Sequence, residues 1–452
     1  MGLSRIFDIS RRSLATYQKA MDITSHNVAN ASNENYTRQR ISFSAENPEK
    51  TAGFIWGAGV KIDDVARIRS TLVDSQLRTS NGEFQMQDQK SAILSQIEQV
   101  FSEPSDLGIS NSLTKFFNSW NELTVTPNST ALRYQVVQSS QQLSSRVKTV
   151  YDSINTIKYD TMRDFTEKTT RVNNLLKQIQ QVNVQVVDSG AVGISANDLM
   201  DSRDAIIDEL STLVNVSVIT DNKNSANVSI GGIQALDASG YVEFDVQVIN
   251  GKLSLVTKEN HAKVSLSGGQ LAGLSSVYSE KIPDYIKSLD DLSNRLVETV
   301  NEQHQKGYSL SDPPQNGILF FDSYSDGNLI INNNILNDIN QIAVSADGTE
   351  GNSEIAVKIA NINHQKTLDG TTMTDFYSRM IARLGNDKQT SDRFAETTDL
   401  VIQQLTQQKG SVSGVSIDEE MTNIIKYQRS YQASARLISI ADEMLETVIR
   451  MV

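Results

Sequence analysis

Four aspartates in one short stretch are the residues of this sequence best spaced to bind a cation. Asp198, Asp201, Asp204 and Asp208 follow one another at intervals of three or four residues, so a helix would place them on one face. A calcium site also needs carbonyl oxygens from a loop, which a helical row does not offer. We therefore expect these carboxylates to form a solvated helix face.

The other residue types that bind metals or carry out catalysis are scarce. Cysteine is absent from the 452 residues, which excludes disulfides, thiolate metal sites and cysteine nucleophiles. The four histidines lie in four separate segments and lack the spacing of a zinc site, H-x-x-x-H or H-E-x-x-H. We therefore expect no metal, no cofactor and no enzymatic activity.

Three consecutive carboxylates near the C-terminus resemble an acid–base pair but have a simpler explanation. Asp418, Glu419 and Glu420 follow Ser416, and Ser416 and Glu419 have the S-x-x-E spacing of a capping box. Negative charge in a first turn also stabilises the positive end of a helix dipole. The cluster therefore predicts the start of a helix, and no catalytic cleft is needed to explain it.

Charge and hydropathy exclude several kinds of partner. The chain carries 41 basic and 54 acidic side chains, a net charge of −13, without a basic stripe, so we expect no nucleic-acid partner. It has no uninterrupted apolar run of about 18 residues, so we expect no membrane partner. The charges spread through its first residues also argue against a cleavable signal peptide.

Few residues interrupt helices in this sequence. It has six prolines, and residues 3–47 and 128–189 contain neither glycine nor proline. In the first segment, apolar residues alternate at intervals of four and three, which predicts a helix that ends at the asparagine-rich run 30–35. Another helix is predicted over 63–101. If 128–189 forms one helix, it is a rod of roughly 90 Å.

The pattern changes over residues 216–274, where apolar and polar residues alternate. Asn250-Gly251 separates two alternating runs, which is a strong signal for a two-residue hairpin turn. A second pair of strands is predicted around the polar turn 221–227. We interpret this segment as a small β domain inserted into the helical rod.

The segment from residue 416 to 452 has the most regular apolar pattern. Two heptad registers starting at Ile417 fit it equally well, each with nine apolar residues among eleven positions, so the stripe is wider than a two-helix seam. We expect this helix to contact more than one neighbour and to be marginal alone, because ordering its backbone costs more than burial contributes. Ile438 belongs to both registers and is expected to be exposed in a free subunit.

Together these patterns predict a mainly α fold with a β insertion. We expect a long helical rod, paired N- and C-terminal coiled-coil helices and a small outward β domain. The predicted parts are an N-terminal assembly helix and loop (1–62), the first part of the rod (63–215), the β domain (216–280), a helix returning to the rod (281–307), a turn-rich region with short strands (308–351), the last part of the rod (352–415) and the C-terminal assembly helix (416–452).

Two passages, one near each end, carry recognisable motifs. The first includes His26-Asn-Val-Ala-Asn30 and Asn35-Tyr-Thr-Arg38, and the second is Ser411-Val-Ser-Gly-Val-Ser-Ile-Asp-Glu-Glu-Met421. The first resembles the bacterial flagellar axial family of rod, hook and hook-associated proteins. The second is similar to the hook-associated protein 1 branch of that family, which joins hook to filament. Where the family usually has glycine before the tyrosine, this chain has Asn35, which tolerates the left-handed conformation.

The resemblance implies a structural protein of the flagellum. Such a protein is exported without a cleaved signal through the flagellar type III apparatus and lies outside the cell, between hook and filament. Copies of the chain would form a ring through their terminal helices. The further partners implied are the hook protein, the next hook-associated junction protein, and an export chaperone that binds the C-terminal helix.

Two sets of residues are candidates for the functional site. The assembly interface, expected from apolar spacing, comprises Leu14, Tyr17, Met21, Val28, Ile417, Met421, Ile424, Tyr431, Ala435, Ile438, Leu445 and Ile449. The family motif, which follows from the resemblance, comprises Asn27, Asn30, Tyr36, Arg38, Asp418, Glu419, Glu420, Tyr427 and Gln428.

Two other classes of protein share some of these features. Another self-assembling protein exported by a type III system, either an axial subunit or a translocator, would also have helical ends. A translocator needs a membrane-inserting apolar stretch, which the sequence lacks. A cell-wall hydrolase needs convergent carboxylates in a pocket, for which the sequence shows no pattern.

Overall fold

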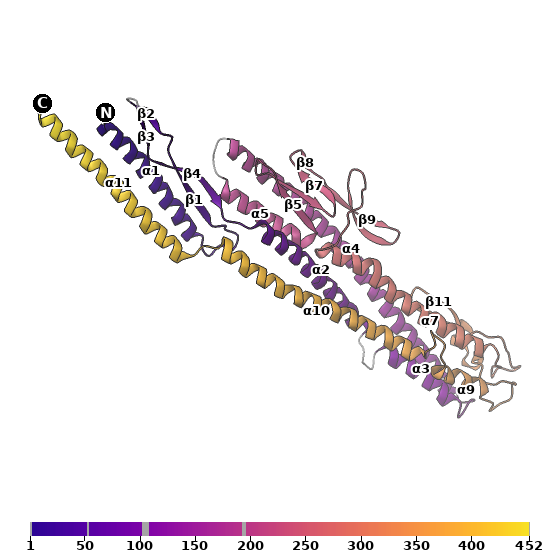
Figure 1. Cartoon of the computed structure of the whole chain (residues 1–452). Coiled ribbons are helices and arrows are strands. Elements are labelled where there is room, and N and C mark those ends of the chain that lie inside the picture. Colours follow the sequence, from indigo (N-terminus) through magenta and orange to yellow (C-terminus); the bar gives the residue numbers. More distant parts are fainter. Residues whose placement is uncertain (1, 52–53, 102–107, 192–195, 452) are drawn as a thin grey trace. The chain divides into compact units, whose positions relative to one another are not determined.

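The fold is mainly α with a strand-rich insertion in the middle of the chain, as the sequence predicts (Figure 1). Long helices lie at both ends of the sequence, also as predicted. The computed structural model describes residues 2–51, 54–101, 108–191 and 196–451.

Two compact units make up the chain, and each collects segments that are far apart in the sequence. Three long helices continue from one unit into the other: α2 (Thr71–Phe101), α4 (Thr130–Ala191) and α10 (Met373–Ser413). The terminal unit, which holds both chain ends, comprises residues 1–82, 171–243 and 398–452, and the middle unit comprises residues 83–170 and 244–397.

The terminal unit begins with α1 (Gly2–Ala29), which ends at the asparagine-rich run as predicted. The prediction of a helix from residue 63 is wrong. Residues 60–67 pair with an earlier strand, so the chain is extended as far as Arg67 and α2 begins only at Thr71. The antiparallel pairs are β1 (Gln39–Ala45) with β4 (Val60–Arg67), and β2 (Glu49–Thr51) with β3 (Phe54–Trp56).

The single long helix predicted over 128–189 is confirmed as α4. It contains 62 residues, which corresponds to a length of about 90 Å. Its apolar seam is buried in both units, for example at Val150 and Ile179. The buried Asn183 of α4 both accepts from the Ala226 N–H (3.0 Å) and donates to the Ala226 carbonyl (2.9 Å), which anchors a sheet to the helix.

That sheet has four antiparallel strands in the order β5-β6-β7-β8 and belongs to the terminal unit. The strand pair predicted around residues 221–227 is confirmed, since Val216 pairs with Ile230 and Val218 with Val228. The strands are β5 (Val216–Thr220), β6 (Ala226–Ile230), β7 (Ile233–Asp237) and β8 (Gly240–Tyr241).

The single β domain predicted over 216–280 is wrong, because its two halves belong to different units. The hairpin at Asn250-Gly251 forms as predicted, but local contacts hold it in the middle unit. The Leu253 N–H donates to Ser279 Oγ (2.9 Å), and the Leu253 carbonyl accepts from Ser275 Oγ (2.6 Å). The elements are β9 (Phe244–Ile249), β10 (Lys252–Thr257) and α6 (Gln270–Ser276), which already lies within the predicted β range.

An aromatic cluster forms the core of the middle unit. The buried rings of Phe116 and Trp120 pack against Phe320 and Phe321, with centroids 5.3 Å apart for Trp120–Phe320 and 6.1 Å for Phe116–Phe321. Besides its parts of α2, α4 and α10, the unit contains α3 (Ile109–Leu123), a π-helical turn (Val277–Lys281), α7 (Ile282–His304), β11 (Phe321–Ser325), β12 (Asn328–Ile331), α8 (Asn333–Asn337), two 3-10 turns (Ile339–Gln341 and Asn361–His364) and α9 (Glu354–Ala360).

The turn between the last two helices depends on glycine. The Gly414 N–H donates to the Gly410 carbonyl (2.9 Å), and a Cβ at Gly414 would overlap that carbonyl oxygen. A residue without a side chain therefore lets the backbone turn closely at this point. The chain then enters α11 (Ile417–Met451), the predicted C-terminal helix, where the Glu419 N–H lies 3.5 Å from Ser416 Oγ. This contact is the Ser416 half of the predicted capping box.

His304 is buried at the end of α7, and both of its ring nitrogens have partners. Nδ1 lies 2.7 Å from the Ile318 carbonyl and donates to it, while Nε2 accepts from the Ala343 N–H at 2.9 Å. A ring that accepts at Nε2 is neutral. Burial lowers the pKa of His304 from 6.5 to about 4. This histidine therefore has a structural role in the middle unit.

We expect mild acid to destabilise the chain through His304. Its folded pKa of about 4 lies below the ordinary 6.5, so the unfolded chain binds the proton first, and stabilisation present above pH 6.5 is lost as the pH falls toward 4. Between pH 7 and pH 5, the free energy of unfolding should fall by about 2 kcal/mol through this group. Urea unfolding at both pH values measures the change. A His304→Gln variant with the same pH dependence as the parent would contradict the assignment.

Candidate assembly site

The two ends of the chain lie side by side as α1 and α11 (Figure 1). The helices are antiparallel, because Tyr17 stacks on Tyr427 (ring centroids 6.4 Å apart) while Asn27, further along α1, bonds to Glu420 near the start of α11. Ala441 is fully buried on α11, and so small a side chain lets two helices approach closely. The predicted pairing of the terminal helices is confirmed.

The two apolar registers of α11 share several positions; where they differ, the positions of one register lie mainly against α1 and those of the other are mainly uncovered. Glu420, Ser434 and Ala441 of the first register are buried, whereas Met421 and Ile449 of the second are exposed. Residues three or four apart share a helix face, so a single neighbouring helix covers only part of a wide stripe. In one chain, α11 therefore keeps apolar positions that α1 does not cover.

Ile438 is not exposed in the single chain, and that expectation is wrong. It is half-buried because it lies between Ser434 and Ala441 on the face that packs against α1. The other predicted interface residues fall into two groups: Leu14, Tyr17, Met21, Val28, Ile424, Tyr431, Ala435 and Leu445 are half-buried, and Ile417, Met421 and Ile449 are exposed.

A buried carboxylate fixes α11 against the loop that follows α1. Glu420 is 2% exposed, and its two oxygens accept from Arg38 Nε (2.8 Å) and from Asn27 Nδ2 (3.0 Å). Arg38 also pairs with Glu419 (2.8 Å), and its backbone N–H donates to the Ser413 carbonyl (3.0 Å). We call these five residues the terminal junction, because they join α1, its following loop and the turn into α11.

Asn27 connects the terminal junction to the tyrosine of the loop. Its Oδ1 accepts from the Tyr36 hydroxyl (2.7 Å) and from the Gln39 N–H (3.0 Å), and its Nδ2 donates to the Gln39 carbonyl (2.8 Å) as well as to Glu420. Both ends of the amide are therefore bonded. Burial, and then the nearby carboxylates, raise the pKa of Tyr36, so its hydroxyl stays protonated and acts as a donor.

Three aromatic rings extend this contact along α11. The Tyr427 ring lies 6.4 Å from Tyr17 of α1 and 5.7 Å from Phe43 of β1, and Tyr17 and Phe43 are 6.1 Å apart. Such rings attract one another beyond the area they bury. Phe43 is not among the predicted site residues, although the alternation of apolar residues along 39–45 is the signal that could have found it.

Tyr36 and Tyr427 extend the terminal junction, whereas the motif residues Asn30, Asp418 and Gln428 lie outside it. Asn30 donates to the His26 carbonyl (3.0 Å) at the end of α1, and Asp418 and Gln428 are exposed.

The chain does turn at Asn35, but without left-handed backbone at that residue. The Asn35 N–H instead donates to Asn33 Oδ1 (3.1 Å). An asparagine side chain that bonds two residues ahead forms a turn without left-handed backbone. This local bond therefore shapes the loop where the family usually has glycine.

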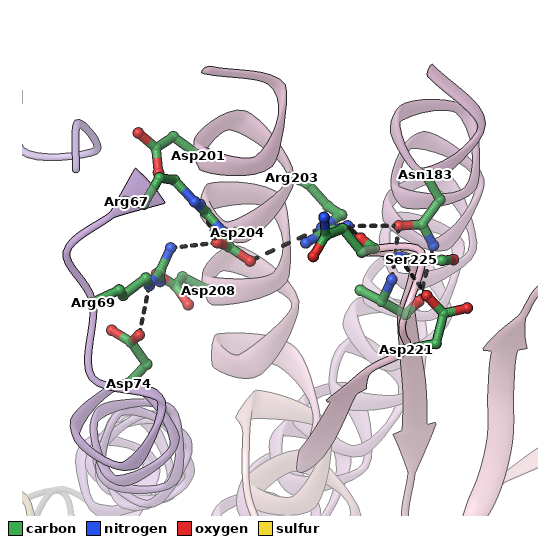
Figure 2. A network of polar contacts seen from close by, with 12 residues as sticks. Arg67, Arg69, Asp74, Asn183, Asp201, Arg203, Asp204, Asp208, Asp221 and Ser225 are labelled. Atoms are coloured by element: carbon green, nitrogen blue, oxygen red, sulfur yellow. Dashed lines mark hydrogen bonds and ion pairs between the residues drawn. The ribbon is translucent and has the colours of Figure 1, made fainter. Parts of the chain in front are cut away.

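The acidic row on α5 (Asn197–Leu213) is not a solvated helix face, and that interpretation is wrong. Asp201 and Asp204 are buried and point toward Arg67 at the end of β4 and Arg69 in the segment between β4 and α2 (Figure 2). Arg67 bonds to both carboxylates at 2.8 Å, and Arg69 pairs with Asp204 as well. Further contacts of this arginine–aspartate cluster include Arg69–Asp74 (2.5 Å) and Arg78–Asp208 (2.6 Å).

Opposite charges compensate for burial within the cluster. Burial alone raises the pKa of Asp204, but Arg69 and Arg67 outweigh it, and the pKa is lowered. Burial alone lowers the pKa of Arg69, but Asp204 and Asp74 outweigh it, and the pKa is raised. Both groups therefore stay charged and hold α5 to the β1–β4 strand pair and to α2.

The cluster also connects to the terminal junction and to the four-stranded sheet. Asp201 accepts from the backbone N–H of Thr37 (2.9 Å), the neighbour of Arg38. On the other side of α5, Arg203 donates to Asn183 Oδ1 (3.1 Å) (Figure 2). Arg203 also donates to the Asn224 carbonyl (2.5 Å). A continuous set of polar contacts thus reaches from α11 to α4.

The charged and polar side chains of the site bind one another. Within the described ranges, no three His, Cys, Asp or Glu side chains are grouped so that they could hold a metal ion. A helix long and apolar enough to cross a membrane is also absent from the described residues. The carboxylates of the site pair with arginines, and the arrangement fixes the two chain ends to each other.

Known proteins are similar to this chain. Residues 94–321 match the family model described as flagellar hook-associated protein FlgK helical domain, and residues 407–451 match the one described as flagellar basal body rod FlgEFG protein C-terminal. The flagellar hook-associated protein 1 of Bacillus subtilis (strain 168) is 30% identical over 98% of this chain and 97% of its own. The chain belongs to the flagellar hook-associated protein 1 family.

More distant members of the hook-associated protein 1 family are also similar to this chain. The protein of the same name from Salmonella typhimurium is 22% identical over 99% of this chain and 100% of its own. The structure of the flagellar hook junction protein FlgK from Burkholderia pseudomallei has the same fold, with a TM-score of 0.64 and 14% identity over 75% of this chain and 100% of that one. As a member of this family, the chain is a structural protein of the flagellum.

We expect the Glu420→Gln substitution to loosen α11. It removes a buried charge that two donors share, which should reduce the protection of α11 amides from hydrogen exchange by about 2–3 kcal/mol. Glu419→Gln is the matched control, because Glu419 contacts the same Arg38 but its side chain is 62% exposed, so its effect should stay below about 1 kcal/mol. Equal effects of the two substitutions would show that the buried carboxylate has no special role.

The arginine–aspartate cluster makes a second prediction. Asp204→Asn leaves Arg67 and Arg69 beside each other without their shared carboxylate, and should lower the free energy of unfolding by about 3–5 kcal/mol. Asp208→Asn, at a more exposed carboxylate that contacts Arg78, should cost less than about 1 kcal/mol. Urea unfolding at neutral pH compares them, because Asp204 is charged there and loses its effect only as the pH falls below the ordinary value of 3.8. Similar losses in both variants would contradict the argument.

Proposed function

We propose that this protein joins hook to filament by assembling with copies of itself into a ring through α1 and α11. The observation that carries the proposal is the apolar face that α11 keeps after it has paired with α1. Large exposed apolar patches on a single chain usually mark interaction surfaces. This face, which we call the outer stripe, comprises Leu437, Ile440, Met444, Val448 and Met451, all of them exposed.

The spacing of the outer stripe supports a helix-packing role. Its members recur at intervals of three or four residues, as the residues on one face of a helix do. Covering each such side chain contributes roughly 1.5–3 kcal/mol. A contact of this kind can be repeated around a closed ring. The exposed Ile417, Met421 and Ile449 are further positions that neighbouring helices would cover.

The proposal includes partners above and below the ring, namely the hook protein and the next hook-associated junction protein. Family membership supports both. Because the terminal junction locks α11 to α1, each subunit would offer these partners a rigid surface. Nothing in this role requires catalysis, so we propose a structural and non-enzymatic protein.

Before assembly, the outer stripe needs a temporary cover. An exposed apolar helix face promotes aggregation, so we propose that an export chaperone binds α11 inside the cell and releases it during export through the flagellar type III apparatus. The protein would then reach its place outside the cell, between hook and filament.

The Ile440→Asp substitution tests the proposal. Ile440 is 50% exposed in the single chain, so the free energy of unfolding of the variant should lie within about 0.5 kcal/mol of the parent's value. In a ring, the same aspartate would be buried without a partner, at a cost of several kcal/mol per subunit. We expect exported protein, no filaments, and filament subunits shed into the medium, measured by electron microscopy and immunoblotting.

Two controls make the result specific. Ile440→Leu has the same volume and should leave filaments intact. Ala441→Asp, at the buried neighbour that faces α1, should instead lower the melting temperature of the isolated protein. Normal filaments on cells that carry Ile440→Asp would refute the assembly role of the outer stripe.

A further inference from the structure

Three Asn-Gly dipeptides occur in the sequence, at residues 81–82, 250–251 and 316–317. An asparagine followed by glycine is prone to spontaneous deamidation, because glycine has no side chain to keep its own backbone nitrogen away from the asparagine side chain. The reaction requires a mobile, exposed asparagine and a glycine N–H that is not held in a hydrogen bond. Since the three dipeptides share the same chemistry, the fold decides which of them reacts.

The first dipeptide is protected by a helix. Asn81 and Gly82 lie inside α2, and Gly82 is buried. In the interior of a helix, each backbone N–H donates to the carbonyl four residues earlier. Attack by the Gly82 nitrogen would require this part of α2 to open first, which a long packed helix opposes. Asn81 is therefore expected to be stable.

The loop dipeptide of the middle unit is exposed, but its glycine nitrogen is already bonded. Asn316 and Gly317 both lie at the surface. The Gly317 N–H donates to the Gln305 carbonyl (3.1 Å). A nitrogen that donates in this way keeps its proton and its position until the hydrogen bond breaks. Asn316 therefore differs from a free Asn-Gly pair by one specific contact.

The remaining dipeptide has neither kind of protection. Asn250 and Gly251 form the two-residue turn between β9 and β10, and both are exposed. Among the hydrogen bonds of the described part of the chain, none involves the Asn250 side chain or the Gly251 N–H. A Cβ placed on Gly251 would have no other atom within 4 Å. The glycine nitrogen is therefore free and the space around it is open.

We propose that Asn250 is a site of spontaneous deamidation in the folded protein. The Gly251 nitrogen gives up its proton and bonds to Cγ of Asn250, while the side-chain amide leaves as ammonia, so that a succinimide ring closes. Water then opens the ring at one of its two carbonyl carbons, which leaves either aspartate or isoaspartate at this position. Water is the only co-reactant. The proposal does not depend on ring assembly.

The two products should affect the turn differently. Asp-Gly suits a two-residue hairpin turn as well as Asn-Gly does, so the aspartate form keeps the hairpin and adds a negative charge at its tip. Isoaspartate routes the main chain through the side-chain carbon, and the longer turn no longer fits the pairing of Ile249 with Lys252. Because β10 carries the buried Leu253 and Leu255, isoaspartate should loosen β10.

Peptide mapping by mass spectrometry tests the site. In the full-length protein, incubated in mildly alkaline buffer, Asn250 should convert at least about tenfold faster than Asn316 or Asn81, because those two sites must open locally before they react. In urea that unfolds the chain, the three asparagines should react at similar rates. Equal rates in the folded protein, or fastest conversion at Asn316, would overturn the proposal. A tenfold preference that persists in urea would also overturn it, since the cause would then lie in the sequence.

Asn250→Gly is the matched control variant. Gly-Gly also suits the turn but has no side-chain amide to lose, so the variant should keep the hydrogen-exchange protection of β10 and show no conversion at this position.

The effect on the hairpin has its own measurement. The isoaspartate form, separated by chromatography from incubated protein, should lose hydrogen-exchange protection in β10 by about tenfold or more. Asn250→Asp, which reproduces the other product, should keep the protection of the parent. Full protection in the isoaspartate form would refute the proposed loosening of β10.

Discussion

The buried carboxylate of Glu420 is the contact on which the arrangement of the two chain ends depends. A charge that leaves water must find partners, and Arg38 and Asn27 supply them. Because these partners lie at the end of α1 and in its following loop, the contact fixes where α11 begins relative to α1. Apolar helix faces can slide or rotate at modest cost, whereas a buried polar contact specifies one register. The face of α11 that remains uncovered follows from that choice.

The arginine–aspartate cluster extends the same principle through the terminal unit. Asp201 and Asp204 receive Arg67 and Arg69 from the hairpin side, and the neighbouring Arg203 reaches Asn183 on α4. Buried ion pairs add little net stability compared with apolar packing, but removing one partner is costly. Here they fix geometry, because they hold α5, the β1–β4 strand pair and α2 in one arrangement. An assembling subunit needs this rigidity so that its contact surfaces keep a constant spacing.

Stability and assembly use different residues of the same helices. Ser434 and Ala441 are small and buried on α11, and they let α1 approach closely, whereas Ile440 and Met444 on a neighbouring face are large and exposed. An ordinary monomer would place its large apolar residues inside and its small or polar residues outside. The reversal on α11 is understandable if a second neighbour completes the core only after export. It also explains why a single chain can be folded and yet incomplete.

The sequence by itself determined the local structure of this protein. The helix α4, the end of α1 and the turn at Asn250-Gly251 follow from residue spacing and turn chemistry, which act over a few residues, and the width of the apolar stripe on α11 follows from its two registers. The motif residues Asn27, Arg38 and Glu420 were also recognisable, although their mutual contacts were not. Only the tertiary structure decided which register of α11 meets α1, that the predicted β domain splits between two units, and that Asp201 and Asp204 are buried against Arg67. The physical reason is that the register of α11 and the burial of the aspartates depend on segments more than a hundred residues apart, while the split of the β domain depends on the helices that each half contacts, and no local pattern encodes either.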